Sequence, residues 1–247
     1  MLPLREVRFE FPKPRPHLYP WNLPALEQLD VLPFQTPVTL LIGDNGSGKS
    51  TFLESFAEVA GFNPEGGSHH ANYHAAHTDT QLAQGLRLVW NRKALNGFFF
   101  RAESFFAYAN YLEDINGMDP YGDRSLHHQS HGESFLSLFR HRLNSRSPSL
   151  YLFDEPESAL STTGQLAFIR LIKEWADSGH TQVIIATHSP ILLAFPGATI
   201  YSFDHGPVAS VSYRESKPYQ LTRTFLEAPE AFLNELFRDD DEAEEES

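Results

Sequence analysis

The stretch Gly43-Asp44-Asn45-Gly46-Ser47-Gly48-Lys49-Ser50-Thr51 fits the pattern G-x-x-x-x-G-K-[ST] of a phosphate-binding loop. An apolar, β-branched run at 38–42 precedes this loop and predicts a buried strand. After the loop, apolar residues recur at helical spacing until Gly61, a residue type typical of helix ends. Strand, glycine-rich loop and helix are the context that the motif requires, so the stretch predicts an α/β fold built around a phosphate site.

The residue types of the loop explain how it binds an anion. Glycines at 43, 46 and 48 permit backbone angles that other residues avoid, so consecutive N–H groups can turn inward. The helix that begins near Lys49 adds the positive end of its dipole. We expect Lys49 to reach the β- and γ-phosphates of a nucleotide, and Ser50 to give a hydroxyl ligand to Mg²⁺. The loop therefore predicts binding of a nucleoside triphosphate, against the alternative of a glycine-rich turn without a ligand.

Composition is typical of a globular protein. The chain has 247 residues, of which 41% are hydrophobic and 20 are Phe, enough for one large domain or one domain with a helical insertion. No apolar run approaches the roughly 18 residues of a membrane span. The first residues carry Arg5 and Arg8 without an apolar segment, so no signal peptide is predicted. The absence of Cys excludes disulfides and thiolate metal sites and fits a cytoplasmic protein.

Negative charge is concentrated at the C-terminus. The net charge is −13, and seven acidic residues lie within 239–246. This pattern predicts a folded domain over 1–238 and a disordered acidic tail over 239–247. The overall charge gives no support for nucleic-acid binding. The clustered basic residues Arg140, Arg142 and Arg146 are the candidates for it, and a solvated helix face is the alternative.

Two stretches in the first half of the chain leave alternatives open. Tyr19 and Trp21 lie in a proline-rich connection, where either ring could stack on an adenine or simply pack against the loop. Four histidines, His69, His70, His74 and His77, invite a metal hypothesis. No carboxylate or Cys stands at a matching spacing, so a solvated loop is the favoured interpretation of this second stretch.

Further strands and a helical lobe follow. The segments 86–90 and 97–100 predict two strands paired across a short polar turn. From about 105 to 145 the pattern is mostly helical, which predicts a lobe between two halves of the sheet. Within this lobe, Ser130-His131-Gly132-Glu133 opens a helix. A serine hydroxyl, a glycine amide and a helix start can bind a second phosphate, or the serine can serve as a helix cap only.

Two later strands end in residues suited to phosphate chemistry. The run 150–153 predicts a buried strand that delivers Asp154 and Glu155 to its carboxyl end. Asp154 can hold Mg²⁺ there, and Glu155 can orient and deprotonate an attacking water. The strand predicted at 182–186 is followed by His188, which can sense the γ-phosphate. A plain acidic strand end and a structural histidine are the alternatives.

Taken in order, the phosphate loop, the segment 130–133, the segment 154–160 and His188 resemble the motif series of the ATP-binding-cassette (ABC) ATPases. The chain from 7 to 237 is similar to the small stand-alone bacterial ATPases of the AAA_21/ABC-like group. The resemblance implies an α/β P-loop fold with a mostly parallel central sheet, flanking helices, an antiparallel β portion and the helical lobe. It also implies cytoplasmic hydrolysis of ATP to ADP and phosphate with Mg²⁺.

The resemblance also implies a role for each motif. The loop 43–51 would be Walker A and 150–154 Walker B. Glu155 would be the catalytic glutamate, 158–161 the D-loop and His188 the switch histidine. Lys49, Mg²⁺ and Glu155 together would supply positioning and charge stabilisation.

The segment containing Ser130, Gly132 and Glu133 would be the signature loop, which reaches the γ-phosphate held by a partner subunit in an ATP-dependent homodimer. Two departures from the family pattern stand out. The signature reads Gln-Ser-His-Gly-Glu instead of Leu-Ser-Gly-Gly-Gln. No Gln stands at the Q-loop position, where Glu103 is the nearest candidate for the metal and water role.

The process driven by hydrolysis stays open at this stage. A soluble mechanochemical ATPase acting on a protein or nucleic acid is favoured by the altered signature and the missing Q-loop glutamine. The alternatives are the nucleotide-binding subunit of a transporter with separate membrane subunits, and a nucleotide sensor with negligible turnover. Glu155 argues against the sensor. A P-loop kinase would have no use for the signature or for His188.

Overall fold

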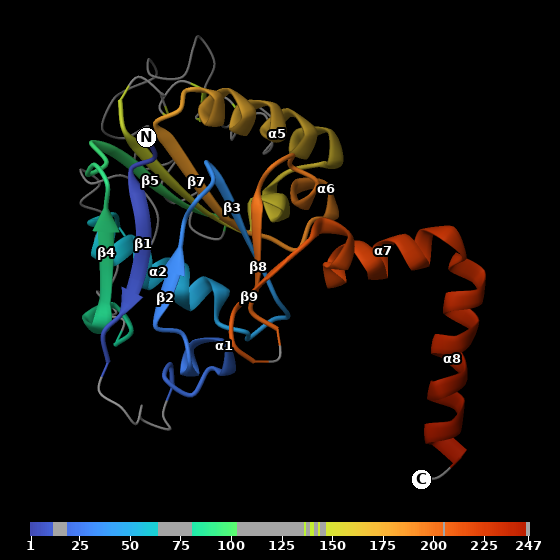
Figure 1. The fold of residues 1–247 in the computed structure, drawn as a ribbon. Helices are drawn as coiled ribbons and strands as arrows, with labels where there is room; N and C mark the ends of the chain where they lie inside the picture. The colour runs from blue at the N-terminus through green and yellow to red at the C-terminus, as the bar shows by residue number, and fades with distance from the viewer. Residues whose placement is uncertain are drawn as a thin grey trace, which may run out of the picture.

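A six-stranded sheet forms the centre of the molecule (Figure 1). The computed structural model describes residues 1–11, 19–63, 81–102, 136, 139–140, 143, 147–204 and 206–245. The strand order is β5-β6-β7-β3-β8-β9, and all neighbours are parallel except β9, which is antiparallel to β8. The strands are β3 (Val38–Ile42), β5 (Asn96–Arg101), β6 (Ser149–Asp154), β7 (Thr181–Ala186), β8 (Thr199–Ser202) and β9 (Ala209–Val211).

The three strands at the middle of the sheet are buried along their whole length. Every residue of β3, β6 and β7 is buried, as expected for parallel strands covered on both faces. Successive side chains point to opposite faces, so Leu40 and Leu41 enter two separate hydrophobic cores. The mostly parallel sheet predicted from the sequence is confirmed.

Each core is closed by a different layer. One core joins the sheet to α5 (Thr162–Asp177) and the short α6 (Pro190–Leu193). The other joins it to α2 (Lys49–Ala60) and to a second, antiparallel sheet. Shorter helical segments are α1 (Pro24–Glu27), η1 (Ala83–Gly85), η3 (Pro156–Ala159) and η4 (Tyr213–Glu215).

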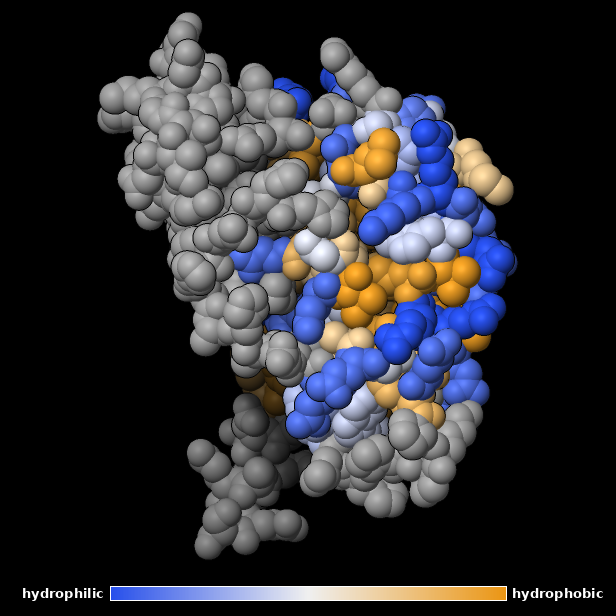
Figure 2. Space-filling model, turned by 90° about the vertical axis from the view of Figure 1, so that its left-hand side faces the viewer, coloured by the Kyte–Doolittle hydropathy of each residue, from blue (hydrophilic) through white to orange (hydrophobic). Residues whose placement is uncertain are grey.

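The antiparallel sheet has the order β2-β1-β4, with β1 at Leu4–Phe9, β2 at Val31–Pro33 and β4 at Leu86–Trp90. It is tied to the central sheet by Gln182, whose amide accepts from Leu4 N–H at 2.5 Å and donates to Leu4 O at 2.9 Å. Figure 2 views the molecule from the side on which this sheet lies and shows apolar residues interspersed with hydrophilic ones. The antiparallel portion predicted from the family resemblance is confirmed.

The predicted pairing between 86–90 and 97–100 is wrong. The first segment, β4, pairs with β1, whereas the second, β5, pairs with β6 in the other sheet. Their burial explains the difference. Residues 97–100 are buried on both faces, which only the central sheet can provide, while β4 is buried at Leu86 and partly or fully exposed beyond it.

Two helices at the C-terminus project from the body (Figure 1). They are α7 (Lys217–Glu227), which the sequence analysis does not anticipate, and α8 (Pro229–Glu245). The tail expected to be disordered from 239 onward is helical as far as Glu245, because Pro229 starts a helix and Glu and Ala are good helix formers. Within the described part of the chain, no helix is both long and apolar enough to cross a membrane.

Candidate functional site

The predicted site residues meet at one edge of the central sheet. Because β3, β6 and β7 are parallel neighbours, their carboxyl ends lie together. The glycine-rich loop follows β3, Asp154 ends β6, and Thr187 and His188 follow β7. Ala186 is opposite both Leu41 and Asp154 in the strand register. The fold thus brings together residues that are far apart in the sequence.

The glycines of the loop are required by its backbone. Gly43, Gly46 and Gly48 have φ values of +152°, +80° and +100°. Gly48 is the N-cap of α2, and a Cβ there would lie 2.8 Å from Leu23 Cδ1. A side chain at this position would therefore meet both a strained backbone and a packed neighbour.

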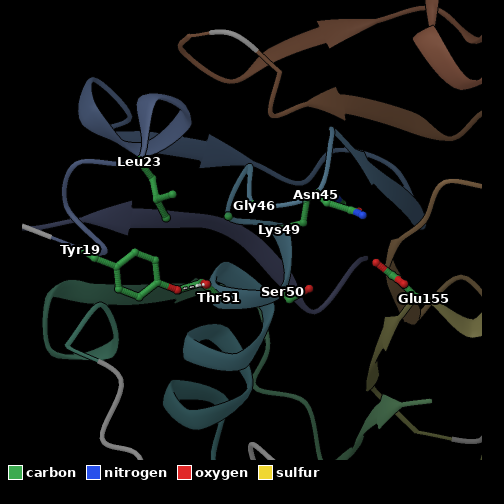
Figure 3. A pocket seen from close by; sticks show the side chains of 9 residues that line it. Tyr19, Leu23, Asn45, Gly46, Lys49, Ser50, Thr51 and Glu155 are labelled. Atoms are coloured by element: carbon green, nitrogen blue, oxygen red, sulfur yellow. Dashed lines mark hydrogen bonds between the residues drawn. The ribbon is translucent and has the colours of Figure 1, made fainter. Parts of the chain in front are cut away.

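A cavity of about 340 Å³ runs along the loop, a size within the range of small-ligand pockets. In Figure 3, Tyr19 and Leu23 lie at one end of this cavity and Glu155 at the other, with the loop between them. The Tyr19 hydroxyl is hydrogen-bonded to Thr51 Oγ1 at 2.5 Å. The lining residues are Tyr19, Leu23, Asn45, Gly46, Gly48, Lys49, Ser50, Thr51 and Glu155.

The two aromatic residues considered for base stacking behave differently. Tyr19 is exposed and lines the cavity. Trp21 instead packs edge-on against Phe11, with ring centroids 4.1 Å apart. Packing therefore accounts for Trp21, whereas Tyr19 is placed to meet a ligand.

Lys49 is a buried cation within this loop, only 4% exposed. Its Nζ donates hydrogen bonds to the carbonyl oxygens of Gly43 at 2.5 Å and Asp44 at 3.2 Å. Burial lowers the pKa of Lys49, and the carboxylates of Glu155, Asp154 and others oppose that shift. An anion bound in the loop would further favour the charged amine.

Ser50 and Asp154 form the candidate metal position. The Ser50 hydroxyl donates a hydrogen bond to Asp154 Oδ1 at 3.2 Å. Burial raises the pKa of Asp154 to about 6, while the charge of Arg101 and the Ser50 hydrogen bond oppose the shift. Arg101 itself is ion-paired with Glu54 at 3.1 Å.

Ser50 and Asp154 suit Mg²⁺ better than they suit a metal ion whose ligands all come from the protein. Among the described residues, no three His, Cys, Asp or Glu side chains converge into a metal cluster. One hydroxyl and one carboxylate are the kind of donor set that Mg²⁺ uses when waters and ligand phosphates complete its shell.

Glu155 and His188 face each other beside the metal position. Glu155 Oε1 lies 3.6 Å from His188 Nε2, and both side chains are partly exposed. Glu155 is the non-glycine residue with positive φ in the described chain, at φ 47° and ψ 53°. Its carbonyl accepts hydrogen bonds from Ser158 N at 3.1 Å and Ser158 Oγ at 2.7 Å, which hold this backbone conformation.

Glu157 is a residue that the sequence analysis does not single out. Its Oε1 accepts hydrogen bonds from the Thr187 hydroxyl at 2.8 Å and from the His188 N–H at 2.6 Å. Burial raises the pKa of this carboxyl. A second acid two positions after Glu155 is the only sequence signal, and it does not distinguish a solvated side chain from one that holds the next loop.

Two further residues outside the predicted set contact the loop. Asp204, just after β8, accepts a hydrogen bond from the Asp44 N–H at 2.7 Å, and Lys217 is ion-paired with the Asp44 carboxylate. Other predicted residues lie outside the described chain: Glu103, Ser130, Gly132, Glu133, the histidines at 69, 70, 74 and 77, Arg142 and Arg146.

Comparisons with known proteins find related ATP-binding proteins. A family model described as "AAA ATPase domain" matches residues 131–193. The cytochrome c biogenesis ATP-binding export protein CcmA of Rhodopseudomonas palustris is 30% identical over 161 residues, which cover 61% of this chain and 78% of that protein. An ABC transporter ATP-binding protein of Methanothermobacter marburgensis is 26% identical over 214 residues, covering 78% of this chain and 75% of that protein.

The fold has a counterpart among solved structures. A metal-chelate type ABC transporter in an inward-facing conformation aligns with a TM-score of 0.52 at 16% identity. The alignment covers 90% of this chain and 88% of that chain, and the likeness bears on the fold alone.

Proposed function

Because the chain belongs to the ABC-type P-loop ATPases, we propose that it binds Mg²⁺-ATP in the cavity along its glycine-rich loop and hydrolyses it. The observation that carries the proposal is the single cavity that contains Lys49, Ser50 and Glu155 and extends to an aromatic ring at Tyr19. A nucleoside triphosphate would span this cavity, with its phosphates on the glycine-rich loop and its base toward Tyr19.

Each side chain has a task that its surroundings support. Lys49 binds the β- and γ-phosphates as a buried cation. Ser50 and Asp154 would hold Mg²⁺, which would supply positive charge to offset that of the phosphates. Glu155 orients the attacking water and accepts its proton, and His188, 3.6 Å from it, contacts the γ-phosphate.

A homodimer with ATP between its subunits is the second part of the proposal. It rests on the family resemblance of the segment 130–133, in which Ser130 and Gly132 would bind the γ-phosphate held by the other subunit. Loss of that phosphate would then remove contacts to both subunits, so hydrolysis would separate them.

A second candidate concerns the process that ATP drives. Relatives of the chain are named as an export protein, a transporter ATP-binding protein and a zinc import ATP-binding protein. These names favour an ATP-binding subunit that assembles with separate membrane subunits. The altered signature and the missing Q-loop glutamine favour a soluble mechanochemical switch instead, and copurification with membranes distinguishes the two.

The test is light scattering on Glu155→Gln with and without Mg²⁺-ATP, beside Lys49→Ala as the control that cannot bind. We expect Glu155→Gln to bind ATP without turnover and to shift from monomer to dimer, and Lys49→Ala to stay monomeric. A Glu155→Gln protein that binds ATP but stays monomeric would overturn the homodimer. Absence of ATP binding by the unaltered chain would overturn the proposed function itself.

A further inference from the structure

Asp44, the second residue of the glycine-rich loop, makes three contacts with three different parts of the molecule. Its N–H donates a hydrogen bond to Asp204 Oδ1 at 2.7 Å. Its carbonyl accepts from Lys49 Nζ at 3.2 Å. Its carboxylate is ion-paired with Lys217. Asp44 therefore links the phosphate-binding lysine to the first residue of α7, which is remote in sequence.

Both partners that hold Asp44 are themselves fixed. Asp204 receives a hydrogen bond from Ser202 Oγ at 3.3 Å and donates its own N–H to that oxygen at 3.2 Å. Lys217 follows Ser216, which is 1% exposed and donates to Tyr213 O at 2.7 Å. The start of α7 is thus anchored on the body, although α7 itself has no buried residue.

The charge of Lys217 matters because carboxylates crowd the loop. Asp44, Asp204, Asp154 and Glu155 all act on the buried Lys49, and a bound triphosphate adds several negative charges close to them. Without Lys217, the negative charge of Asp44 would be less compensated and would repel that ligand more strongly. The hydrogen bond to Asp44 raises the pKa of Lys217, an amine that is charged at neutral pH even at its ordinary pKa.

The ion pair between Lys217 and Asp44 adds little to the free energy of unfolding. Both side chains are about half exposed, at 53% and 54%, and exposed pairs add little to stability. A surface pair of this kind has its main effect on the local potential. In this case the pair lies on the glycine-rich loop, next in sequence to Asn45, which lines the cavity.

We propose that Lys217 is a positioning residue for nucleotide binding, because it neutralises and orients Asp44. The affinity of the loop for ATP then depends on how the C-terminal helices are held against the body of the protein. This inference rests on the proposed function. It adds a contact from the end of the chain to the loop, so anything that displaces α7 weakens ATP binding without touching Lys49, Mg²⁺ or Glu155.

The experiment compares Lys217→Ala, Lys217→Glu and Lys217→Arg with Lys173→Ala. Lys173 is a matched control, because it is 58% exposed and ion-paired with Asp177 on α5, away from the loop. We expect KM for ATP and the Kd for ATP to rise about tenfold in Lys217→Ala and further in Lys217→Glu, with kcat within about twofold of the unaltered chain. Lys217→Arg and Lys173→Ala should keep both constants.

A double variant separates charge from mere packing. Asp44→Asn combined with Lys217→Ala should bind ATP more tightly than Lys217→Ala alone, because the negative charge at position 44 is gone. Equal KM values for Lys217→Ala and Lys173→Ala would overturn the proposal, as would a double variant weaker than Lys217→Ala. An unaltered chain that binds no ATP would instead refute the proposed function, so the two failures are distinguishable.

Discussion

Glu157 Oε1 accepts a 2.6 Å hydrogen bond from the main-chain N–H of His188, so one side chain joins the segment after β6 to the segment after β7. The same oxygen accepts from the Thr187 hydroxyl at 2.8 Å. Because β6 and β7 end side by side, this carboxylate ties the segment that carries Glu155 to the segment that carries His188. Glu157 contacts neither the loop cavity nor the metal position directly, so its effect on chemistry is indirect.

Glu157→Ala is expected to destabilise the protein, because it leaves two donors without their acceptor. Removing such a partner costs about 1–3 kcal/mol in the free energy of unfolding. Glu157→Gln retains an acceptor oxygen at the same place and should lose less. Urea denaturation of both variants measures the difference, and equal stability of Glu157→Ala and the unaltered chain would contradict this account.

Acid should weaken metal-dependent nucleotide binding. Burial raises the pKa of Asp154 to about 6, so in the absence of metal its carboxyl takes up a proton as the pH falls through that value. A protonated carboxyl is a poor Mg²⁺ ligand, hence the Mg²⁺ concentration needed for ATP binding should increase below about pH 6. Titrations of Mg²⁺ at several pH values test this. In Asp154→Asn the pH dependence should flatten; an unaltered dependence in that variant would assign it to another group.

Ser50→Ala should reduce the contribution of Mg²⁺ to the affinity for ATP. The substitution removes the hydroxyl that bonds Asp154 Oδ1 at 3.2 Å and that we assign to the metal. We expect affinity for Mg²⁺-ATP to fall by about tenfold or more, and affinity for ATP in the presence of a chelator to change much less. Calorimetry with and without Mg²⁺ gives both constants. A similar loss in the two conditions would place Ser50 on the phosphates rather than on the metal.

Truncation of Tyr19 should affect ATP binding, whereas truncation of Trp21 should affect stability. Tyr19 lines the cavity, so Tyr19→Ala should raise the Kd for ATP by about tenfold, while Tyr19→Phe, which keeps the ring and loses only the Thr51 contact, should raise it little. Trp21→Ala removes packing against Phe11 and should lower stability instead. Unchanged ATP binding by Tyr19→Ala would exclude a stacked base at this end.

The residues at the centre of the candidate site can be picked out from the sequence because their signals are local. Glycines at fixed spacing, a lysine at a helix start and two acids at a strand end each mark a position before any neighbour is known. Parallel strands then bring Lys49, Asp154 and His188 to one edge without further information. The mostly parallel sheet follows from the same apolar runs.

The contacts between segments are what the sequence leaves undetermined. Nothing local distinguishes Glu157, which holds His188, from a solvated acid, and nothing links Lys217 to Asp44 across the chain. The predicted partner of the segment 86–90 is wrong because strand pairing depends on which sheet has room for a strand buried on both faces. The sequence analysis does not anticipate helix α7, although Ser216 and Pro218 mark its start.

The place of β3 in the sheet has a consequence for how the chain acquires its site during synthesis. Val38 pairs with Val183, and Thr39 pairs with Thr199, so both neighbours of the strand before the loop are made much later. Asp204 and Lys217, which hold Asp44, are made later still. On the ribosome the glycine-rich loop emerges before these partners, while both edges of its strand are still unpaired. The nucleotide loop is thus translated before both strands that flank β3 and before the two side chains that hold Asp44.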